Sequence, residues 1–257
     1  TLLGKTRSEW LAILHKHQEL KFRKAALIAL EAIGARAKGV VEGVAAALET
    51  DKDAEIRRSA ALTLGRMGPD AKSALNTLAA ALRTDKDASV REAAASAFGG
   101  PMAELAEPFA KHLGQALKDS YGGAREAAAI SLKNMGIKAR DALPDLLEVA
   151  ADPKADRIPR LYSLQMITRL CGEDLGAPAK VMNAILQTEK EALPAIREAA
   201  AEGLGQLGLI DSVPVLGKLL GDKARGMRLA AMIALGKFGP KAGPAWSGVK
   251  TLFQDQD

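Results

Sequence analysis

The chain has 257 residues, of which 48% are hydrophobic and 26% are charged, and this composition excludes a disordered chain. Only 4% are aromatic, and alanine and leucine, both strong helix formers, dominate the apolar residues, so the composition predicts an all-α protein. The single cysteine, Cys171, excludes an internal disulfide, and every apolar run is far shorter than the roughly 20 residues of a membrane span.

The start of the chain carries two expectations about its origin. It begins with Thr1 rather than Met, which predicts a segment excised from a longer chain. No basic and apolar leader opens it, so the cytoplasm is the expected compartment, although a removed leader would leave no trace.

An internal repeat organises the sequence. From the N-terminus onward, an arginine that follows an apolar residue and precedes alanines recurs at one constant interval through four copies, and only internal repetition explains this spacing. The pattern lapses at Pro159 and then returns twice, so we predict seven units with a degenerate fifth. The repeated arginines are Arg23, Arg57, Arg91, Arg125, Arg197 and Arg228.

Each unit contains two predicted helices. Apolar residues recur at i, i+3, i+4, i+7 and i+11 from Ala71 to Leu82, which predicts a first helix, and at i, i+4, i+8 and i+11 from Ile56 to Met67, which predicts a second helix. A glycine such as Gly68 closes the second helix. In chain order, second helices are predicted over 22–33, 56–67, 124–135, 196–207 and 227–238, and another opens at Val90.

The second helices share the pattern hydrophobic-Arg-x-x-Ala-Ala-x-x-Leu-x-x-hydrophobic-Gly, and in four units an aspartate stands six positions before the arginine. The four combinations are Asp51 with Arg57, Asp85 with Arg91, Asp119 with Arg125, and Asp222 with Arg228. This pattern resembles the HEAT-repeat family, in particular its short bacterial, PBS-lyase-like repeats. The resemblance implies one right-handed α-solenoid over 1–257, built from about seven stacked helix pairs, whose second helices line a concave face used as an interaction scaffold.

The chain departs from the family pattern most clearly in the fifth unit. Pro159 replaces the arginine, and the step from this position to Arg197 is longer than the steps between the first four units. We therefore expect an irregular segment around 152–180. Arg160 and Tyr162 make this segment a candidate for specialised contact with a partner. The alternative is a repeat whose sequence has diverged because selection on it is relaxed.

The repeated aspartates and arginines are interpreted as a structural ladder rather than as a catalytic array. A catalytic group is seldom needed four times in one chain, whereas a feature of the whole fold recurs in every unit. We expect each aspartate to bridge the turn between two helices and each arginine to tie neighbouring units.

No residue constellation in the sequence indicates catalysis, a metal or a cofactor, so we predict a protein that is not an enzyme. His15 and His17 are two positions apart and point in different directions on a helix, which excludes a shared metal. Cys171 has no histidine near it in sequence to serve as a base, which favours a buried packing role.

The predicted function is a non-catalytic scaffold that binds a protein partner, whose identity the sequence does not give. Family geometry and helical phase place a set of polar residues on the concave face, mixed in sign and poor in aromatics, which suits a polar contact of modest affinity. The candidate partner-binding residues are Arg58, Arg66, Glu92, Glu126, Lys133, Asn134, Arg160, Tyr162, Gln206 and Lys237.

The distribution of charge leaves nucleic acid as an alternative partner. The net charge of +5 lies entirely within 1–38, while the remaining residues are balanced. A nucleic-acid groove spreads basic residues along a face, so nucleic-acid binding, as in HEAT-like DNA glycosylases, is disfavoured except at the first unit. A basic terminal cap is the other reading of this unit. A phycobilin-lyase-like enzyme is a third alternative, because related short repeats occur in that family.

The C-terminal residues predict one further first helix without a partner. Its apolar stripe indicates either a continuation in a longer chain or end-to-end self-association. The stripe consists of Trp246, Val249, Leu252 and Phe253.

Overall fold

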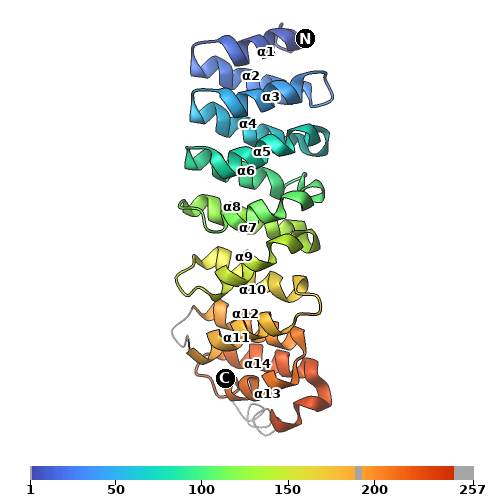
Figure 1. Ribbon diagram of the computed structural model, residues 1–257, viewed down its shortest axis with the longest axis vertical. Coiled ribbons are helices and arrows are strands. Elements are labelled where there is room, and N and C mark those ends of the chain that lie inside the picture. Colours follow the sequence, from blue (N-terminus) through green and yellow to red (C-terminus); the bar gives the residue numbers. More distant parts are fainter. Residues whose placement is uncertain (1, 189–192, 246–257) are drawn as a thin grey trace. The chain divides into compact units, whose positions relative to one another are not determined.

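The computed structural model describes residues 2–188 and 193–245. Within them, regular secondary structure is helical, apart from an isolated bridge between Leu2 and Lys5. The chain divides into two compact units at the boundary between Ala142 and Leu143, named here the N-terminal part and the C-terminal part. Figure 1 shows the order of the helices in each part.

The N-terminal part contains four helix pairs, named repeats 1 to 4, and short 3-10 segments between them. The pairs are α1 (Arg7–Lys16) with α2 (Leu20–Ile33), α3 (Val40–Thr50) with α4 (Ala54–Met67), α5 (Leu75–Thr84) with α6 (Ala88–Gly99), and α7 (Ala110–Ala116) with α8 (Gly122–Met135). The 3-10 segments are η1 (Gly68–Ala74), η2 (Ala103–Leu105), η3 (Glu107–Phe109) and η4 (Gly136–Ala142).

The C-terminal part contains three helix pairs, named repeats 5 to 7. They are α9 (Leu143–Ala151) with α10 (Arg157–Leu170), α11 (Gly176–Thr188) with α12 (Pro194–Leu207), and α13 (Val213–Leu219) with α14 (Arg225–Phe238). The 3-10 segments are η5 (Ile210–Ser212) and η6 (Gly239–Ala245).

These pairs confirm the predicted all-α fold of HEAT-like helix pairs. The first helix predicted from Ala71 is partly wrong, because Ala71 and Ala74 lie in η1, and the α-helix begins only at Leu75. The stripe of Trp246, Val249, Leu252 and Phe253 lies outside the described residues, and the single continuous solenoid stays a prediction. None of the described helices combines the length and apolar character that crossing a membrane requires.

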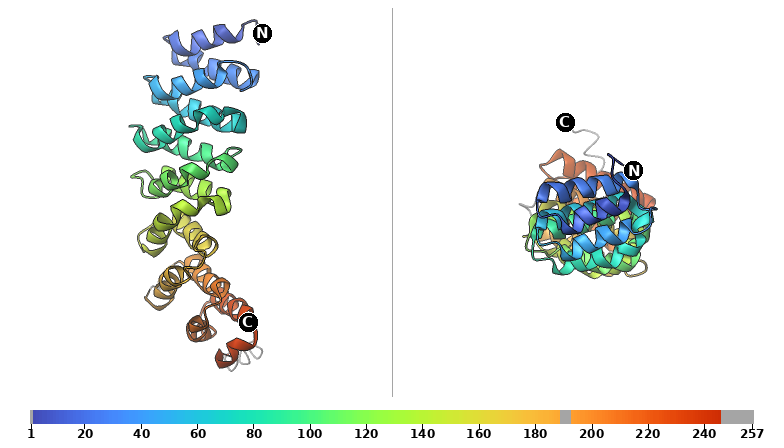
Figure 2. Two further views of the ribbon diagram at one scale, coloured as in Figure 1. Left: turned by 45° about the vertical axis from the view of Figure 1, so that its right-hand side comes forward. Right: turned by 90° about the horizontal axis from the view of Figure 1, so that it is seen from above.

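Within each part, the second helix of one repeat packs against the second helix of the next (Figure 2). A small residue on each helix makes this approach close. A Cβ atom on Gly65 of α4 would lie 2.9 Å from the Cα atom of Ala97 of α6, and a Cβ atom on Gly205 of α12 would lie 2.7 Å from the Cα atom of Ala234 of α14. Close packing of this kind leaves no room for larger side chains in the contact row.

The residues at the helix ends explain where several of the helices begin and end. Gly68 and Gly136, which end α4 and α8, have φ of +61° and +59°, a conformation that side chains with a Cβ rarely adopt. Pro159 is the third residue of α10, where a backbone N–H has no acceptor within the helix, so the proline leaves this helix intact.

Candidate partner-binding surface

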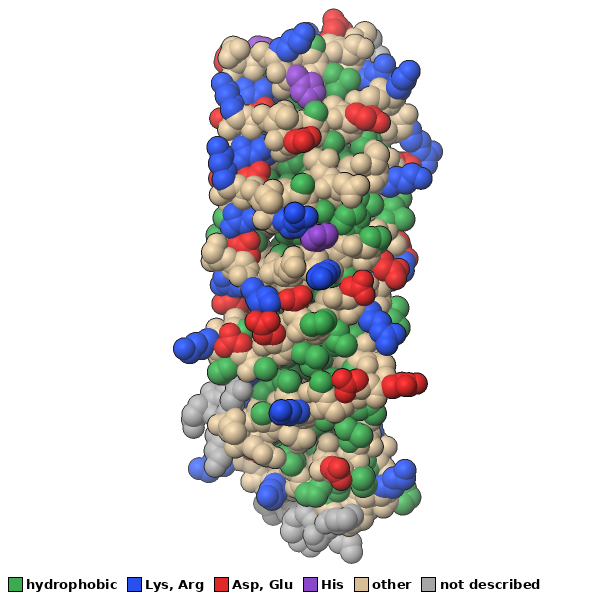
Figure 3. Space-filling view, viewed as in Figure 1, with side chains coloured by type: hydrophobic (Ala, Val, Ile, Leu, Met, Phe, Trp, Pro, Cys, Tyr) green, Lys and Arg blue, Asp and Glu red, His purple; other side chains and the backbone are tan. Residues whose placement is uncertain are grey.

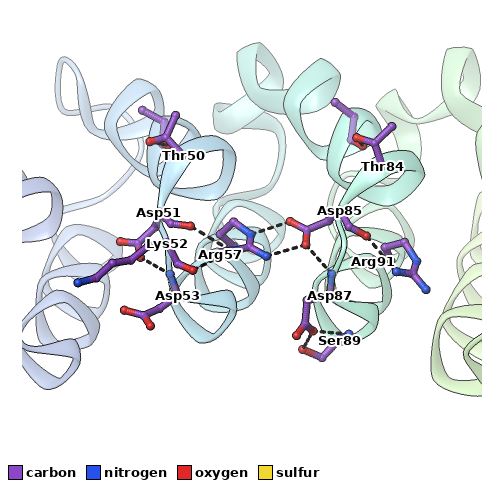
Figure 4. Close-up of polar contacts among 12 residues, drawn as sticks. Thr50, Asp51, Lys52, Asp53, Arg57, Thr84, Asp85, Asp87, Ser89 and Arg91 are labelled. Atoms are coloured by element: carbon purple, nitrogen blue, oxygen red, sulfur yellow. Dashed lines mark hydrogen bonds and ion pairs between the residues drawn. The ribbon is translucent and has the colours of Figure 1, made fainter.

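In four repeats, an arginine at the turn between the first and second helices joins its repeat to the next one. In repeat 2, Arg57 is only 5% exposed, and its Nε and Nη2 atoms donate hydrogen bonds to the two carboxylate oxygens of Asp85 at 2.7 and 2.8 Å. Its Nη1 atom donates to the backbone oxygen of Asp51 at 3.0 Å (Figure 4). One guanidinium group therefore holds its own turn and the turn of repeat 3.

The same bidentate arrangement recurs one repeat later. Arg91 donates to the carboxylate of Asp119 at 2.7 and 2.8 Å and to the backbone oxygen of Asp85 at 2.9 Å. The prediction that the arginine ties neighbouring repeats is thus confirmed for Arg57 and Arg91. The aspartate six positions earlier supplies only its backbone carbonyl, however, and the carboxylate that pairs with the arginine comes from the following repeat.

The first and sixth repeats follow the same rule with local changes. Arg23 forms ion pairs with Asp51, at 3.0 Å from its Nε atom, and with Asp53. Repeat 1 has His17 at the place of the aspartate, and the backbone oxygen of His17 still accepts a hydrogen bond from Arg23 at 2.9 Å. In the C-terminal part, Arg197 pairs with Asp222 at 2.7 Å. Ion pairs of this kind therefore join repeat 1 to 2, repeat 2 to 3, repeat 3 to 4 and repeat 6 to 7.

Each ladder aspartate also fixes its own turn, as predicted. The Oδ1 atom of Asp85 accepts a hydrogen bond from the backbone N–H of Asp87 at 2.9 Å, and the Oδ1 atom of Asp119 accepts one from Tyr121 at 2.8 Å. This local hydrogen bond holds the turn and orients the carboxylate toward the arginine of the preceding repeat.

The ladder shifts the pKa values of its members. The hydrogen bond from Arg91 is the main cause that lowers the pKa of Asp119 below its usual value. Burial raises the pKa of Asp85, but hydrogen bonds from Arg57 and from the backbone of Asp87 outweigh it and lower the pKa overall. Hydrogen bonding to Asp85 raises the pKa of Arg57. The ladder therefore favours the charged form of both partners.

This shift predicts that the fold loses stability in acid. Carboxylates with a lowered pKa in the folded state stabilise it fully above the ordinary aspartate pKa of about 3.9, and that contribution disappears as the pH falls through the lower folded value. Thermal unfolding followed by circular dichroism should therefore show a midpoint that falls steeply below about pH 4. The Asp119→Asn variant should have a lower thermal unfolding midpoint than the unchanged chain at pH 7, and its midpoint should decrease less as the pH is lowered. A decrease equal to that of the unchanged chain would contradict the role of Asp119.

A groove of about 640 Å³ lies beside the ladder between the turns of repeats 2 and 3, with Arg57 in its wall. The hydroxyls of Thr50 and Thr84 in its lining donate to backbone oxygens one helical turn earlier, each at 2.8 Å. The guanidinium group and the hydroxyls are thus engaged in structural hydrogen bonds, and we interpret the groove as a consequence of stacking. Among the described residues, no three His, Cys, Asp or Glu side chains gather as a metal site requires.

The other site is the second-helix surface, defined as the residues one, five and nine positions after the arginine that opens each regular second helix. On α8 these are Glu126, Ile130 and Asn134, and all three are exposed. Most of the predicted partner-binding residues lie on or beside this surface and are at least partly exposed. They are Arg58, Arg66, Glu92, Glu126, Lys133, Asn134, Gln206 and Lys237, while Tyr162 is half-buried on α10 of the irregular repeat and lies outside this surface.

Three of these residues hold neighbouring second helices together. Arg66 forms a bidentate ion pair with Glu31 at 2.6 Å, and this hydrogen bond lowers the pKa of Glu31. Asn134 donates to the backbone oxygen of Gly99 at 2.8 Å, and Gln206 accepts from Thr168 at 2.9 Å. These side chains have a structural task on the surface that the sequence did not indicate.

The prediction for Arg160 is wrong. Arg160 is only 4% exposed, and its Nε atom donates to the backbone oxygen of Ala150 at 3.1 Å. Ala150 lies in the last turn of α9, where backbone carbonyls lack donor partners within the helix, so the guanidinium group satisfies a helix end. Arg160 is therefore part of the interior of repeat 5.

The sequence analysis missed a set of exposed isoleucines on the second-helix surface. Five positions after the arginine, the N-terminal part has Ile28, which is 70% exposed, and Ile130, which is 40% exposed. The same position in the C-terminal part is Ile233, which is 48% exposed. Aligning the units on the arginine would have shown an isoleucine at this position in repeats 1, 4 and 7, whereas Leu62, Ser96 and Glu202 occupy it in repeats 2, 3 and 6.

Part of the positive charge at the basic first repeat is compensated by acidic side chains. Lys21, Arg23, Lys24 and Arg36 account for half of the basic residues in 1–38, and each is in an ion pair with an acidic side chain. On the face shown in Figure 3, basic and acidic side chains alternate without a stripe of one sign. The expected basic groove of a nucleic-acid-binding protein has no counterpart on that face.

Comparison with known proteins agrees with this architecture. A family model described as HEAT repeats matches residues 8–99 and 182–246. No curated protein matches the chain. Among solved structures, the complex of CpcE and CpcF of phycocyanin lyase from Nostoc sp. PCC7120 is similar at a TM-score of 0.51 and 22% identity, over 96% of this chain and 95% of that one.

Two further structures show the same fold. YibA of Escherichia coli is 19% identical with a TM-score of 0.64, over 98% of this chain and 88% of that one. Yeast importin-β (Kap95p) is 12% identical with a TM-score of 0.61, over 93% of this chain and 36% of that one. At these identities, the likeness shows the fold alone. Because the family model covers more than half of the sequence, and the helix pairs and ladder match it, the chain belongs to the HEAT-repeat proteins.

Proposed function

We propose that the chain is a non-catalytic scaffold that binds a protein partner through its second-helix surface. The observation that carries the proposal is that Ile28 and Ile130, on second helices of the N-terminal part, are each exposed among charged side chains. An exposed apolar centre with a polar rim is the composition of a protein-binding site, because the centre supplies affinity and the rim supplies specificity.

Repeat 4 shows this arrangement on a single helix. Ile130 lies one turn from Glu126 and from Lys133 on α8, and all three side chains are exposed. Burying one isoleucine fully stabilises a complex by roughly 1.5–3 kcal/mol, while exposed charges around it contribute little affinity. The isoleucines are therefore the residues expected to dominate binding.

The ladder supports a role as a binding scaffold, because it fixes the register of neighbouring second helices. Arg57 and Arg91 hold successive turns with buried bidentate ion pairs, which keeps neighbouring second helices in a fixed register. A preorganised surface loses less conformational entropy on binding. Nucleic-acid binding and a phycobilin-lyase-like activity remain the alternatives from the sequence, and the cytoplasmic location remains a prediction.

Site-specific photocrosslinking tests the proposal. A benzoylphenylalanine residue at position 28 or 130 should crosslink to a protein in a native lysate. Ile137, which is 73% exposed but lies in η4 after the end of α8 rather than on a second helix, provides the control position. Equal crosslinking from positions 28, 130 and 137, or crosslinking to nucleic acid rather than protein, would overturn the proposed function.

A further inference from the structure

A pocket of about 280 Å³ lies between repeats 1 and 2, beside the turn that leads into α2. The groove between repeats 2 and 3 is lined by three basic and three acidic side chains, which balance. The pocket has three basic side chains and one acidic side chain, so its walls carry two net positive charges when its two histidines are neutral. The side chains concerned are Lys16, Arg23, Lys52, His15, His17 and Asp51.

The basic character of the pocket arises from a sequence difference in the first repeat. The four residues that begin eight positions before the ladder arginine are 15–18, His-Lys-His-Gln, in repeat 1 and 49–52, Glu-Thr-Asp-Lys, in repeat 2. Imidazoles thus stand in repeat 1 at the places of both acidic side chains, and the lysine stands at the second place rather than the fourth. Repeat 1 therefore lacks the acidic groups that balance the groove between repeats 2 and 3.

The one carboxylate in the pocket is already neutralised. Asp51 accepts hydrogen bonds from Nη2 of Arg23 at 3.2 Å and from the backbone N–H of Asp53 at 2.9 Å, and the Nε atom of Arg23 lies 3.0 Å from its other oxygen. Lys16 and Lys52, in contrast, form no ion pair within the part of the chain that the structure describes. Figure 4 shows Lys52 extending away from the ladder. Two ammonium groups are therefore available to an anion.

The end of α1 presents hydrogen-bond donors to the same pocket. The Nδ1 atom of His17 accepts a hydrogen bond from the backbone N–H of Glu19 at 3.2 Å, so Nε2 carries the proton of the neutral ring and can donate. The ring centroid of Phe22 lies 4.3 Å from that of His17. The backbone oxygens of His17 and Gln18 would repel an anion, but both accept hydrogen bonds from Arg23 at 2.9 Å. Arg23 thus takes up the acceptors that would oppose an anion here.

We propose that this pocket binds the phosphate group of a phosphorylated serine or threonine of a protein partner. A phosphoserine carries a charge of about −1.5 to −2 at pH 7, which matches the two free ammonium groups, whereas a carboxylate would neutralise only one of them. The volume lies below the roughly 300–1,000 Å³ of sites for drug-sized ligands, so it suits a side chain rather than a whole small molecule.

This inference rests on the proposed function, because the phosphate is carried by the protein that the second-helix surface binds. Arg23 in the wall of the pocket and the exposed Ile28 lie five residues apart on α2, which is a rise of about 7.5 Å along the helix axis. One segment of a partner can therefore fill the pocket and cover Ile28.

Proton NMR of the histidine rings tests the inference on the full chain, which has three histidines. The probe is a short peptide of glycine, alanine and one phosphoserine, titrated at pH 7 and low salt. The ring signals of His15 and His17 should shift as the peptide binds, and those of His112, which lies on α7, should not. The same peptide with glutamate in place of phosphoserine should bind about fivefold more weakly, because it carries about one charge less.

Substitution of the free lysines provides a second measurement. Lys16→Ala and Lys52→Ala should each weaken binding of the phosphoserine peptide about fivefold at low salt, and added salt should reduce the difference. Lys86→Ala is the matched control, because Lys86 stands at the place of Lys52 one repeat later and lines only the balanced groove. It should leave binding unchanged.

Three results would overturn the inference directly: unshifted signals of His15 and His17, equal binding of the phosphoserine, glutamate and serine peptides, or equal weakening by Lys52→Ala and Lys86→Ala. Tighter binding of inorganic phosphate than of the phosphopeptide would assign the pocket to a free anion, and tighter binding of a single-stranded oligonucleotide would assign it to nucleic acid. Either result would overturn the inference as well. Crosslinking of a protein from position 28 or 130 together with any of these results would leave the proposed function standing.

Discussion

Replacing Arg57 with alanine is expected to lower the free energy of unfolding by about 3–5 kcal/mol, the range for removing one partner of a buried ion pair. The variant loses the bidentate contact with Asp85 and the hydrogen bond to the backbone oxygen of Asp51. The carboxylate of Asp85 is left inside the interface between repeats 2 and 3 without its cation, and that desolvated charge accounts for most of the loss.

The neighbouring residue supplies the control for this measurement. Arg58 is exposed, so Arg58→Ala should change the free energy of unfolding by no more than about 0.5 kcal/mol. Urea unfolding followed by circular dichroism measures both variants, and hydrogen exchange of repeats 2 and 3 shows where stability is lost. Equal effects of Arg57→Ala and Arg58→Ala would show that the ladder contributes nothing beyond a surface ion pair.

Replacing Gly205 with alanine is the second substitution with a large expected effect. The added Cβ atom would lie 2.7 Å from the Cα atom of Ala234, so α12 and α14 must move apart. Overpacking of this kind costs about 1–3 kcal/mol, and the higher helix propensity of alanine offsets up to about 1 kcal/mol of it. The free energy of unfolding of the C-terminal part should fall by the difference.

Gly236→Ala is the matched variant at the corresponding position of α14. Its Cβ atom meets nothing within 4 Å, so helix propensity acts alone and the variant should gain up to about 1 kcal/mol in the free energy of unfolding. Thermal unfolding of the two variants side by side separates propensity from packing. A loss of stability in Gly236→Ala similar to that in Gly205→Ala would contradict the open face on α14.

Both predictions concern the contacts that keep second helices in register. The ladder fixes the turns at one end of each pair, and residues such as Arg66 with Glu31 tie the opposite ends of neighbouring second helices. On α2, the exposed Ile28 lies between the ladder residue Arg23 and Glu31. A substitution that loosens the ladder should therefore also weaken partner binding, although Arg57 is buried and contacts no partner.

The sequence determined the helix pairs, their number in the described residues and the arginines of the ladder. These features depend on the spacing of residues along the chain, which can be read directly from the sequence. Examples are the apolar periodicity of 56–67 and the recurrence of arginine at equal intervals from Arg23 to Arg125. The start of the first helix of repeat 3 was missed because the periodicity of Ala71 and Ala74 is the same in a 3-10 segment that leads into an α-helix.

Only the tertiary structure decided which groups meet. Arg57 is closer in sequence to Asp51 than to Asp85, yet it pairs with the carboxylate of Asp85, because stacking brings the next turn to the guanidinium group. Arg160 became interior and Ile130 became surface for the same reason: a side chain's environment depends on the helix packed beside it. Spacing along one chain specifies the helices, and the contacts between stacked repeats specify the ladder and decide which side chains stay exposed.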